Sequence, residues 1–360
     1  MKKINVAVIF GGKSVEHEVS VESARSVCAI ISRDPAYRLL PVYIDKTGRW
    51  SAKDMNFFGG KKKAGREMTY NASKNAFYSG GKRLAIDAAF SLIHGNTGED
   101  GKLQGLLELA GIPYVGCDVL ASALAMDKKL SKTAAELAGL PVLKDAVVTA
   151  KTFRKKFRAV SAAAAKMGYP VFVKPVSLGS SVGVVKVKKP GELKRAVAYA
   201  LKFDREVMIE KGVDRAREIV CGVLGDWENA KASLCGEVKP RGKHEFYDYE
   251  AKYVDNDGMR LLIPAPLSKA VSEKIREYAS KIFMAVKGYG LSRVDFFINP
   301  ENEKEVYFCE INTIPGFTSH SLYPRLWEKT GVKPGRLVRE LINLALKRQA
   351  FKKRLRTERG

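Results

Sequence analysis

The first third of the chain alternates apolar runs with a helical segment, and this alternation restricts the fold more than any other feature. Apolar runs at 4–10, 39–44 and 85–94 are typical of buried strands, and 21–32 is predicted to be helical. Strands that alternate with helices usually form a parallel sheet. The stretch 53–83 is polar and contains glycines, so we expect an insertion on the surface.

The chain is long enough for more than one domain. Its 360 residues exceed one ordinary compact core and suit two or three domains. We expect an α/β domain at 1–127, a small α+β domain at 128–214, a domain of longer strands at 215–350 and a basic tail at 351–360. The predicted fold class is therefore a multidomain chain of α/β and α+β type.

The composition is strongly basic. Lysine and arginine number 63 against 39 acidic residues, which gives a formal net charge of +24. This excess would suit nucleotides, nucleic acid or a membrane surface. Neither basic stretch, 61–83 nor the tail from 347, interleaves aromatic with basic residues as a base-stacking groove does. We therefore predict solvated surface and no nucleic-acid partner.

The cysteines and the N-terminus indicate a cytoplasmic protein. The five cysteines are scattered, odd in number and without a CxxC pair, which favours reduced thiols. The N-terminus lacks the long apolar region and cleavage site of a signal peptide. No stretch approaches the roughly twenty apolar residues that cross a bilayer, so no membrane insertion is expected.

Two late strands carry polar side chains within apolar runs. Side chains alternate across a strand, so Arg293 and Asp295 share one face of SRVDFFINP, and Glu310 and Asn312 share one face of VYFCEIN. Asp, Glu and Asn are poor strand formers, which favours a functional site over ordinary surface residues. All-oxygen ligands suit Mg²⁺, which bridges phosphates. If the strands are neighbours, they form a magnesium site.

Three loops contain glycines that allow an unusual backbone path. In 174–184, a lysine at a strand end precedes a glycine-serine loop that could cradle phosphate, although a tight hairpin has the same composition. In 94–105, glycines precede a helix whose first amides could attract an anion, while Glu99 and Asp100 could simply cap that helix. The turn at 11–20 is not GxGxxG, which weakens a dinucleotide interpretation.

Taken in order, these motifs resemble those of one family. Eight motifs are similar, in the same order, to motifs of D-alanine:D-alanine ligases of the ATP-grasp superfamily. They are GGKSVEHEVS, HGNTGEDGKLQG, MDKKLSK, VKPVSLGSSVGV, EKGV with REI, FYDYEAKY, SRVDFF and EINTIPGFTSHSL. The resemblance covers about 6–346, and ordered motifs are far more specific than one alone. It implies a Rossmann-like N-terminal domain followed by an ATP-grasp fold.

The resemblance implies an ATP site with two Mg²⁺ ions, for which Mn²⁺ can substitute. The metal ligands are Asp295, Glu310 and Asn312. A second group of matched residues contacts the nucleotide: Lys128, Lys174 and Ser181 near the phosphates, Glu210, Lys211 and Val213 at the adenine, Glu218 at the ribose, and Lys252 at the γ-phosphate.

The same resemblance implies subsites for two D-alanine molecules. Matched residues are Glu16 at the first ammonium group with His94 nearby, Ser180 and Tyr253 as its hydrogen-bonding partners, Arg293 and the Gly316 amide at the oxyanion, and Ser321 and Leu322 at the second carboxylate. The loop that carries Lys252 and Tyr253 is expected to close over the site and exclude water.

The implied reaction joins two D-alanine molecules through an acyl phosphate, in a protein expected to be a homodimer. D-lactate and D-serine ligases share the ATP motifs, and Tyr253, which lactate ligases replace, favours the dipeptide. A nucleic-acid-binding protein and an inactive relative remain as alternatives. We expect His17 and His244 to be solvated, and His320 to lie beside Ser321.

Overall fold

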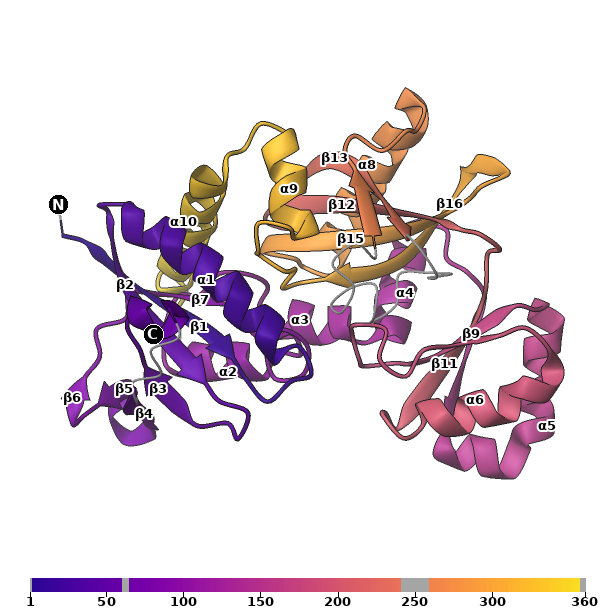
Figure 1. Cartoon of the computed structure of the whole chain (residues 1–360), viewed down its shortest axis with the longest axis horizontal. Coiled ribbons are helices and arrows are strands. Elements are labelled where there is room, and N and C mark those ends of the chain that lie inside the picture. Colours follow the sequence, from indigo (N-terminus) through magenta and orange to yellow (C-terminus); the bar gives the residue numbers. More distant parts are fainter. Residues whose placement is uncertain (1, 60–64, 241–258, 357–360) are drawn as a thin grey trace.

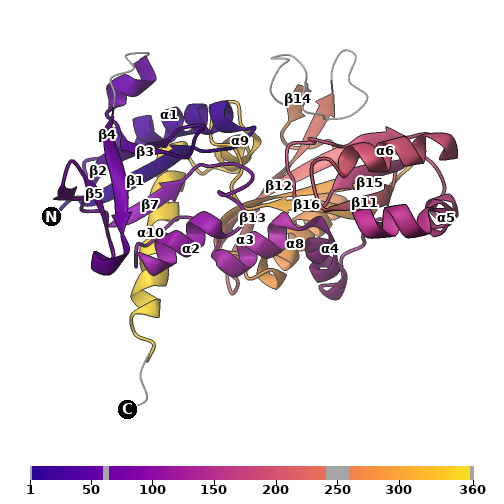
Figure 2. The ribbon, with the colours of Figure 1, turned by 90° about the horizontal axis from the view of Figure 1, so that it is seen from below.

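The computed structural model describes residues 2–59, 65–240 and 259–356. Three β-sheets lie along the long axis of the molecule, each with its own helices (Figure 1). In chain order, the first sheet has seven strands, the central sheet four and the last sheet five among these residues. In space, the five-stranded last sheet lies between the other two (Figure 1). Viewed from below, helices α2 (Lys102–Leu109), α3 (Val119–Met126) and α4 (Lys128–Leu137) run in series along one side (Figure 2).

The first sheet contains the parallel strands that the alternating pattern predicts. Its order is β6-β5-β4-β3-β2-β1-β7, and β1 pairs in parallel with β2 and β7. The elements are β1 (Ile4–Gly11), α1 (His17–Arg33), β2 (Tyr37–Ile44), β3 (Trp50–Ala52), η1 (Met55–Gly59), β4 (Arg66–Asn71), η2 (Ala72–Lys74), β5 (Ala76–Ser79), β6 (Lys82–Arg83) and β7 (Ala88–Ser91).

The stretch 53–83 is not simply a surface insertion. Its strands β4, β5 and β6 continue the sheet in antiparallel fashion beyond β3. Met68 and Phe77 are buried and pack with Ile9 and Val42 of the parallel strands. The expectation was therefore wrong in this respect, because a few apolar residues attach a mostly polar segment to the core.

The central sheet has the order β10-β9-β11-β8. Val171, Val173, Val207 and Ile209 face two helices and form one core with them. The opposite face carries the polar side chains of the site described below. The elements are β8 (Asp145–Thr149), α5 (Ala150–Met167), β9 (Val171–Pro175), β10 (Val185–Val187), η3 (Pro190–Glu192), α6 (Leu193–Ala200) and β11 (Glu206–Lys211).

The last sheet is antiparallel, with the order β14-β13-β12-β15-β16. One face packs against α8 together with α3 and α4 in a single core. The other face meets α9 at one end and is open at the other. The elements are β12 (Arg217–Gly225), β13 (Ala230–Pro240), β14 (Met259–Leu262), α8 (Lys269–Ala285), β15 (Gly290–Asn299), β16 (Asn302–Asn312), α9 (Leu322–Lys329) and α10 (Pro334–Lys352).

Two helices also pack against elements that are distant in the chain. Helix α4 contacts β16 and α8 of the last sheet, and α10 contacts α1 and β7 of the first sheet. Leu337, Leu341 and Ile342 of α10 belong to the same core as Val6 and Phe10. The boundaries expected near 127 and 214 remain predictions, since these cores combine residues from distant parts of the chain.

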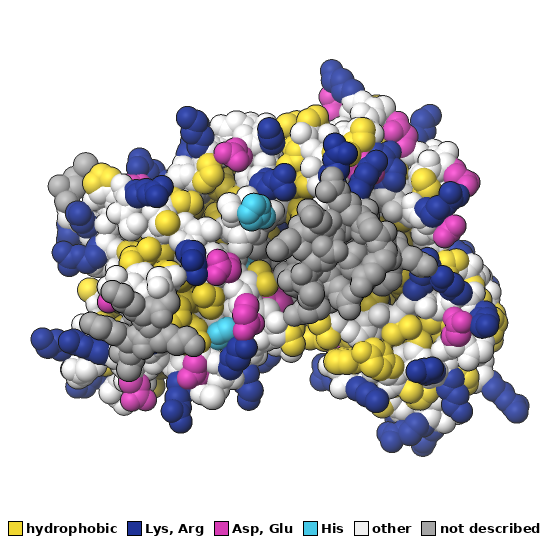
Figure 3. Space-filling model, in the orientation of Figure 1, with side chains coloured by type: hydrophobic (Ala, Val, Ile, Leu, Met, Phe, Trp, Pro, Cys, Tyr) yellow, Lys and Arg dark blue, Asp and Glu magenta, His cyan; other side chains and the backbone are white. Residues whose placement is uncertain are grey.

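Basic side chains are scattered over the face of the molecule shown in Figure 3. Lys and Arg occur around its rim and over the α5 and α6 unit. None of the helices in the described ranges combines the length and apolar character that spanning a bilayer requires.

Candidate active site

Two adjoining cavities lie between the sheets. The larger has a volume of about 710 Å³ and the smaller about 370 Å³. Lys128, Leu178, Gly179, Glu310 and Leu322 line both cavities, so the two spaces share a wall. Every described site residue that the sequence predicts lines one of them.

The shared wall is built on β15 and β16, which are neighbours. Their antiparallel register places Asp295 opposite Glu310 and Arg293 opposite Asn312. Directly opposite residues project from the same face, so the four polar side chains gather at one place. Val294 occupies the opposite face and is fully buried in the core with α8, as the alternation predicts.

Arg293 holds the Asp295 carboxylate with two hydrogen bonds. Its Nε and Nη2 each donate to a different oxygen of Asp295 at 2.7 Å, and Nη2 lies 4.0 Å from Glu310 Oε1. Such a paired contact fixes the guanidinium in one orientation. The arginine therefore lies beside both carboxylates and lines the larger cavity together with Glu310.

The donor set fits a hard divalent cation. Asp295 and Glu310 offer carboxylate oxygens, and Asn312 offers an amide oxygen that also accepts the Ile314 amide at 3.0 Å. No group of three or more His, Cys, Asp or Glu side chains suited to a metal occurs in the described residues. The site instead combines two carboxylates with an amide oxygen, and oxygen ligands of this kind suit Mg²⁺.

The glycine-serine loop adopts an uncommon backbone conformation. Ser180 and Ser181 both have φ of 56°, in the left-handed region that non-glycine residues rarely enter. Lys128 Nζ donates to the Leu178 carbonyl at 2.5 Å, which ties the start of α4 to this loop. Strained loops of this kind are concentrated at ligand sites.

A chain of alternating charges lies beneath the smaller cavity. Lys174 and Lys132 bind the two oxygens of Glu210 at 2.5 and 2.7 Å, and Lys132 also lies 3.1 Å from Asp145. Burial would raise the pKa of Glu210, but the charges of Lys174 and Lys132 lower it. Glu210 is therefore an ionised carboxylate inside the protein.

The rest of the smaller cavity suits a flat ring joined to polar groups. Phe172 and Phe297 contribute aromatic side chains, and Leu143 and Val220 contribute aliphatic ones. Lys211 donates to the Gly168 carbonyl at 3.1 Å, and this bond orients the strand end. Val213 and Glu218 line the same cavity.

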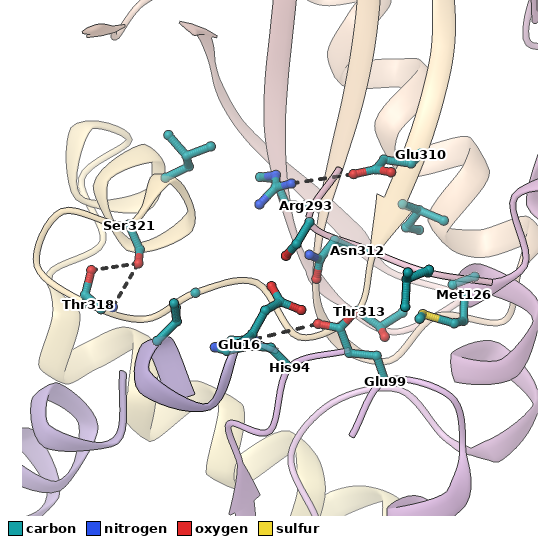
Figure 4. A pocket seen from close by; sticks show the side chains of 18 of the residues that line it. Glu16, His94, Glu99, Met126, Arg293, Glu310, Asn312, Thr313, Thr318 and Ser321 are labelled. Carbon is teal, nitrogen blue, oxygen red and sulfur yellow. Dashed lines mark hydrogen bonds and ion pairs between the residues drawn. The ribbon is translucent and has the colours of Figure 1, made fainter. Parts of the chain in front are cut away.

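Glu16 and His94 meet at one side of the larger cavity (Figure 4). His94 Nδ1 lies 2.8 Å from the Ile314 carbonyl and 3.7 Å from Glu99 Oε1. Burial would lower the pKa of His94, but hydrogen bonding to Glu99 and the charge of Glu16 raise it. A side chain at Gly95 would approach Glu16 Oε2 to 3.0 Å, so a glycine there leaves room for the carboxylate.

Ser321 lies on another side of this cavity, with Thr318 beside it (Figure 4). Ser321 Oγ accepts the Thr318 amide at 3.0 Å and lies 2.8 Å from Thr318 Oγ1. Ser321 immediately precedes α9, and the amides that begin a helix favour an anion. Gly316 and Leu322 line the same cavity.

Three residues named from the sequence lie outside the described residues, and one expectation about a histidine was wrong. Lys252, Tyr253 and His244 lie outside the described residues. His17 was expected to be solvated, but it is buried, with Nδ1 2.7 Å from the Gly12 carbonyl and Nε2 3.1 Å from Tyr43 Oη. His320 lines the cavity, as Ser321 does.

Sequence reasoning missed two buried charged residues. Glu99 does not cap α2 but lies buried beside His94. Lys132 is fully buried on α4. Lys132 lies three residues before Ala135, on the apolar face of a predicted helix. This spacing was the available signal that Lys132 is buried.

Comparisons with known proteins agree with this arrangement. The family models described as D-ala D-ala ligase N-terminus and C-terminus match residues 5–117 and 135–343. The chain is 43% identical to D-alanine--D-alanine ligase A of Bradyrhizobium diazoefficiens, over 99% of this chain and 98% of that protein.

Solved structures of ligases are also similar to this chain. The D-alanine-D-alanine ligase from Coxiella burnetii has a TM-score of 0.83 at 35% identity, and covers 98% of this chain and 97% of its own. The VanG D-Ala:D-Ser ligase from Enterococcus faecalis has a TM-score of 0.84 at 34% identity, and covers 96% of this chain and 100% of its own. With both domain models and a full-length relative matched, the chain belongs to the D-alanine–D-alanine ligase family.

Proposed function

We propose that this chain joins two D-alanine molecules into D-alanyl-D-alanine for peptidoglycan precursor synthesis, with ATP converted to ADP and phosphate. The observation that carries this proposal is the shared wall, where Arg293, Asp295, Glu310 and Asn312 lie between two cavities. One cavity suits a nucleotide and the other suits small charged molecules.

The nucleotide occupies the smaller cavity. Lys128, Lys174, Ser181 and the strained loop hold its phosphates, Glu210, Lys211 and Val213 hold the adenine, and Glu218 holds the ribose. Asp295, Glu310 and Asn312 would hold two Mg²⁺ ions, for which Mn²⁺ would be a substitute. When bound, these ions neutralise phosphate charge during transfer.

The first step makes a poor electrophile reactive. A carboxylate oxygen of the first D-alanine attacks the γ-phosphorus, which forms D-alanyl phosphate and releases ADP. Glu16 holds the ammonium group of this substrate, and His94 lies next to the same subsite. The ion pair orients the carboxylate toward the shared wall.

The second step forms the peptide bond. The amine of the second D-alanine attacks the acyl carbon, phosphate leaves, and the amine loses a proton. Arg293 and the Gly316 amide stabilise the oxyanion of the tetrahedral intermediate. Ser321 and the first amides of α9, including that of Leu322, bind the carboxylate of the second substrate.

We give the role of a lid to the loop that carries Lys252 and Tyr253, which lie outside the described residues. By resemblance to the family, Lys252 would contact the γ-phosphate, and Tyr253 would hydrogen-bond with Ser180 and Glu16 on closure. Closure excludes water, which protects the acyl phosphate from hydrolysis. Tyr253 favours D-alanine over D-lactate as acceptor, and the likeness to a D-Ala:D-Ser ligase makes D-serine the second candidate acceptor.

The finer fold assignments follow from the same proposal. The first sheet is the core of a Rossmann-like domain, and the central and last sheets enclose the nucleotide as an ATP-grasp fold. The protein acts in the cytoplasm as a homodimer. Exposed leucines on successive helices support a subunit contact: Leu109, Leu120, Leu130 and Leu137.

One end-point assay tests the proposal. The protein is supplied with D-alanine, ATP and Mg²⁺, alone and with equal D-lactate or D-serine, and products are identified by mass. We expect D-alanyl-D-alanine as the main product, with one phosphate released per dipeptide. A depsipeptide or a D-serine product as the main species near neutral pH would overturn the assigned acceptor.

A further inference from the structure

A buried lysine beneath the smaller cavity has no place in the roles above. The side chain of Lys132, on α4, is only 1% exposed. An ammonium group removed from water is tolerated only when protein acceptors replace its hydration. The acceptors around Lys132 therefore show what this residue does.

The Lys132 ammonium group has three acceptors close to it. Its Nζ donates to the Leu143 carbonyl and to Glu210 Oε1 at 2.7 Å each, and it forms an ion pair with Asp145 Oδ2 at 3.1 Å. An ammonium group only donates hydrogen bonds, and these oxygens take the place of its hydration shell. Lys132 is thus fixed in position by two elements outside its own helix.

The same contacts fix the carboxylate of Glu210. Lys132 binds one of its oxygens, and Lys174 binds the other at 2.5 Å. A carboxylate held through both oxygens cannot rotate without losing an ion pair in the interior. Loss of Lys132 would leave Glu210 attached on one side only.

A fixed, ionised carboxylate discriminates between rings. Glu210 lines the smaller cavity with the aromatic side chains of Phe172 and Phe297, whereas Lys132 is not among its described lining residues. A carboxylate only accepts hydrogen bonds, so it attracts a ring that bears an amino group. A ring with a carbonyl oxygen at that place would meet a second acceptor and be rejected.

We propose that Lys132 is a positioning residue, which fixes the Glu210 carboxylate so that the site selects an amino-bearing purine over an oxo-bearing one. This inference rests on the proposed function, because it takes the smaller cavity as the nucleotide site. Lys132 acts through Glu210 and does not contact the substrate. Its loss should change nucleotide choice and leave D-alanine recognition intact.

Lys132→Met tests the proposal, with Lys129→Met as the matched control. Lys129 lies on the same helix and binds the other oxygen of Asp145 at 2.9 Å, but its side chain is 41% exposed. For Lys132→Met we expect about a tenfold rise in KM for ATP and a similar loss of preference for ATP over GTP. KM for D-alanine, kcat at saturating ATP and all constants of Lys129→Met should stay within about twofold of wild type.

Two further variants keep the test decisive. If Lys132→Met does not fold, Lys132→Met/Asp145→Asn removes one cation and one anion together and should show the same loss. Glu210→Gln should also lose the preference for ATP over GTP. Adding Lys132→Met to it should not lower this preference further, because both changes remove the same interaction. A folded Lys132 variant with an unchanged ATP-to-GTP ratio would overturn the inference, as would equal rises in KM for ATP and D-alanine.

Failure of the inference can be separated from failure of the proposed function. Calorimetry with ATP and GTP in the absence of D-alanine measures nucleotide preference directly. A wild-type protein that makes no dipeptide but prefers ATP, with the preference lost in Lys132→Met, would refute the reaction and support the positioning role. A wild-type protein with no preference between ATP and GTP would refute the positioning role.

Discussion

At the scale of single residues, the two-residue period of a strand decides which side chains reach the cavity and which reach the core. Arg293 and Asp295 project from one face of β15, while Val294 projects into the core. The same strand therefore anchors itself in the interior and presents charge to the cavity. Arg293 can be changed with little effect on the core.

Arg293→Ala should nearly abolish turnover and leave nucleotide binding largely intact. Loss of one donor to a developing oxyanion lowers kcat by a factor on the order of 100 to 1,000 in comparable sites. We would measure kcat with D-alanine at saturating ATP, and ATP affinity by calorimetry. Arg293→Lys keeps the positive charge but loses the paired hydrogen bonds, so its kcat should lie between those of wild type and Arg293→Ala. An equal loss of ATP affinity would contradict the oxyanion role.

Residue-scale prediction succeeded where local period decided the outcome. The shared face of Asp295 and Arg293 follows from alternation within one strand. The burial of His17 and Lys132 does not, because it depends on Tyr43 and Glu210, which are distant in sequence. A polar residue in a helix gives no local sign of the partner that will cover it.

At the scale of elements, a buried arginine adds polar contacts to the apolar packing of the last helix. Arg348 on α10 is buried, and it donates to the carbonyls of Gly116 and Tyr114 at 2.8 Å each. Its guanidinium also lies between the rings of Tyr114 and Tyr289, at 4.2 and 4.7 Å from their centroids. The side chain joins α10 to residues near the end of the first unit and to the turn before β15.

Arg348→Ala should destabilise the protein by about 3 kcal/mol, because two buried carbonyls lose a charged donor and two rings lose a contact. Urea unfolding measures the change. Lys347→Ala, an exposed neighbour on the same helix, is the control and should stay within about 0.5 kcal/mol of wild type. A loss as small as that of the control would show that the packing of α10 does not depend on this side chain.

Element-scale prediction was best for segments with strong periodicity. The helix predicted at 21–32 lies within α1 (His17–Arg33), and the strand predicted at 4–10 is β1 (Ile4–Gly11). The stretch 53–83 was harder, since its strands are short and largely polar. Their pairing is a long-range property that depends on an existing edge at β3.

At the scale of the whole molecule, buried charges connect two units. Helix α4 packs on the last sheet, while Glu210 and Asp145 belong to the central sheet. Lys132 therefore links the two sheets beneath the smaller cavity through ion pairs. The division into domains stays a prediction from the sequence. The sequence could not show that α4 and α10 would each pack on a sheet distant in the chain.

The link predicts an acid-sensitive attachment between the units. The pKa of Glu210 is lowered in the folded protein from its ordinary value of 4.5, so its ionised form stabilises the fold above pH 4.5. That stability is lost as pH falls through the lower folded value, at a rate of no more than about 1.4 kcal/mol per pH unit. Unfolding free energies measured between about pH 3 and 6 should fall more steeply for wild type than for Glu210→Gln. Parallel curves would contradict the prediction.

The packing of α10 against the first sheet also bears on synthesis. Residues of α10 complete the core that contains Val6 and Phe10, more than three hundred positions earlier in the chain. A ribosome adds residues in order, so the apolar surface of α1 and β7 is made long before the helix that covers it. Until 334–352 emerge, the nascent first unit has an unsealed side, and a chaperone that shields it would improve the yield of native protein.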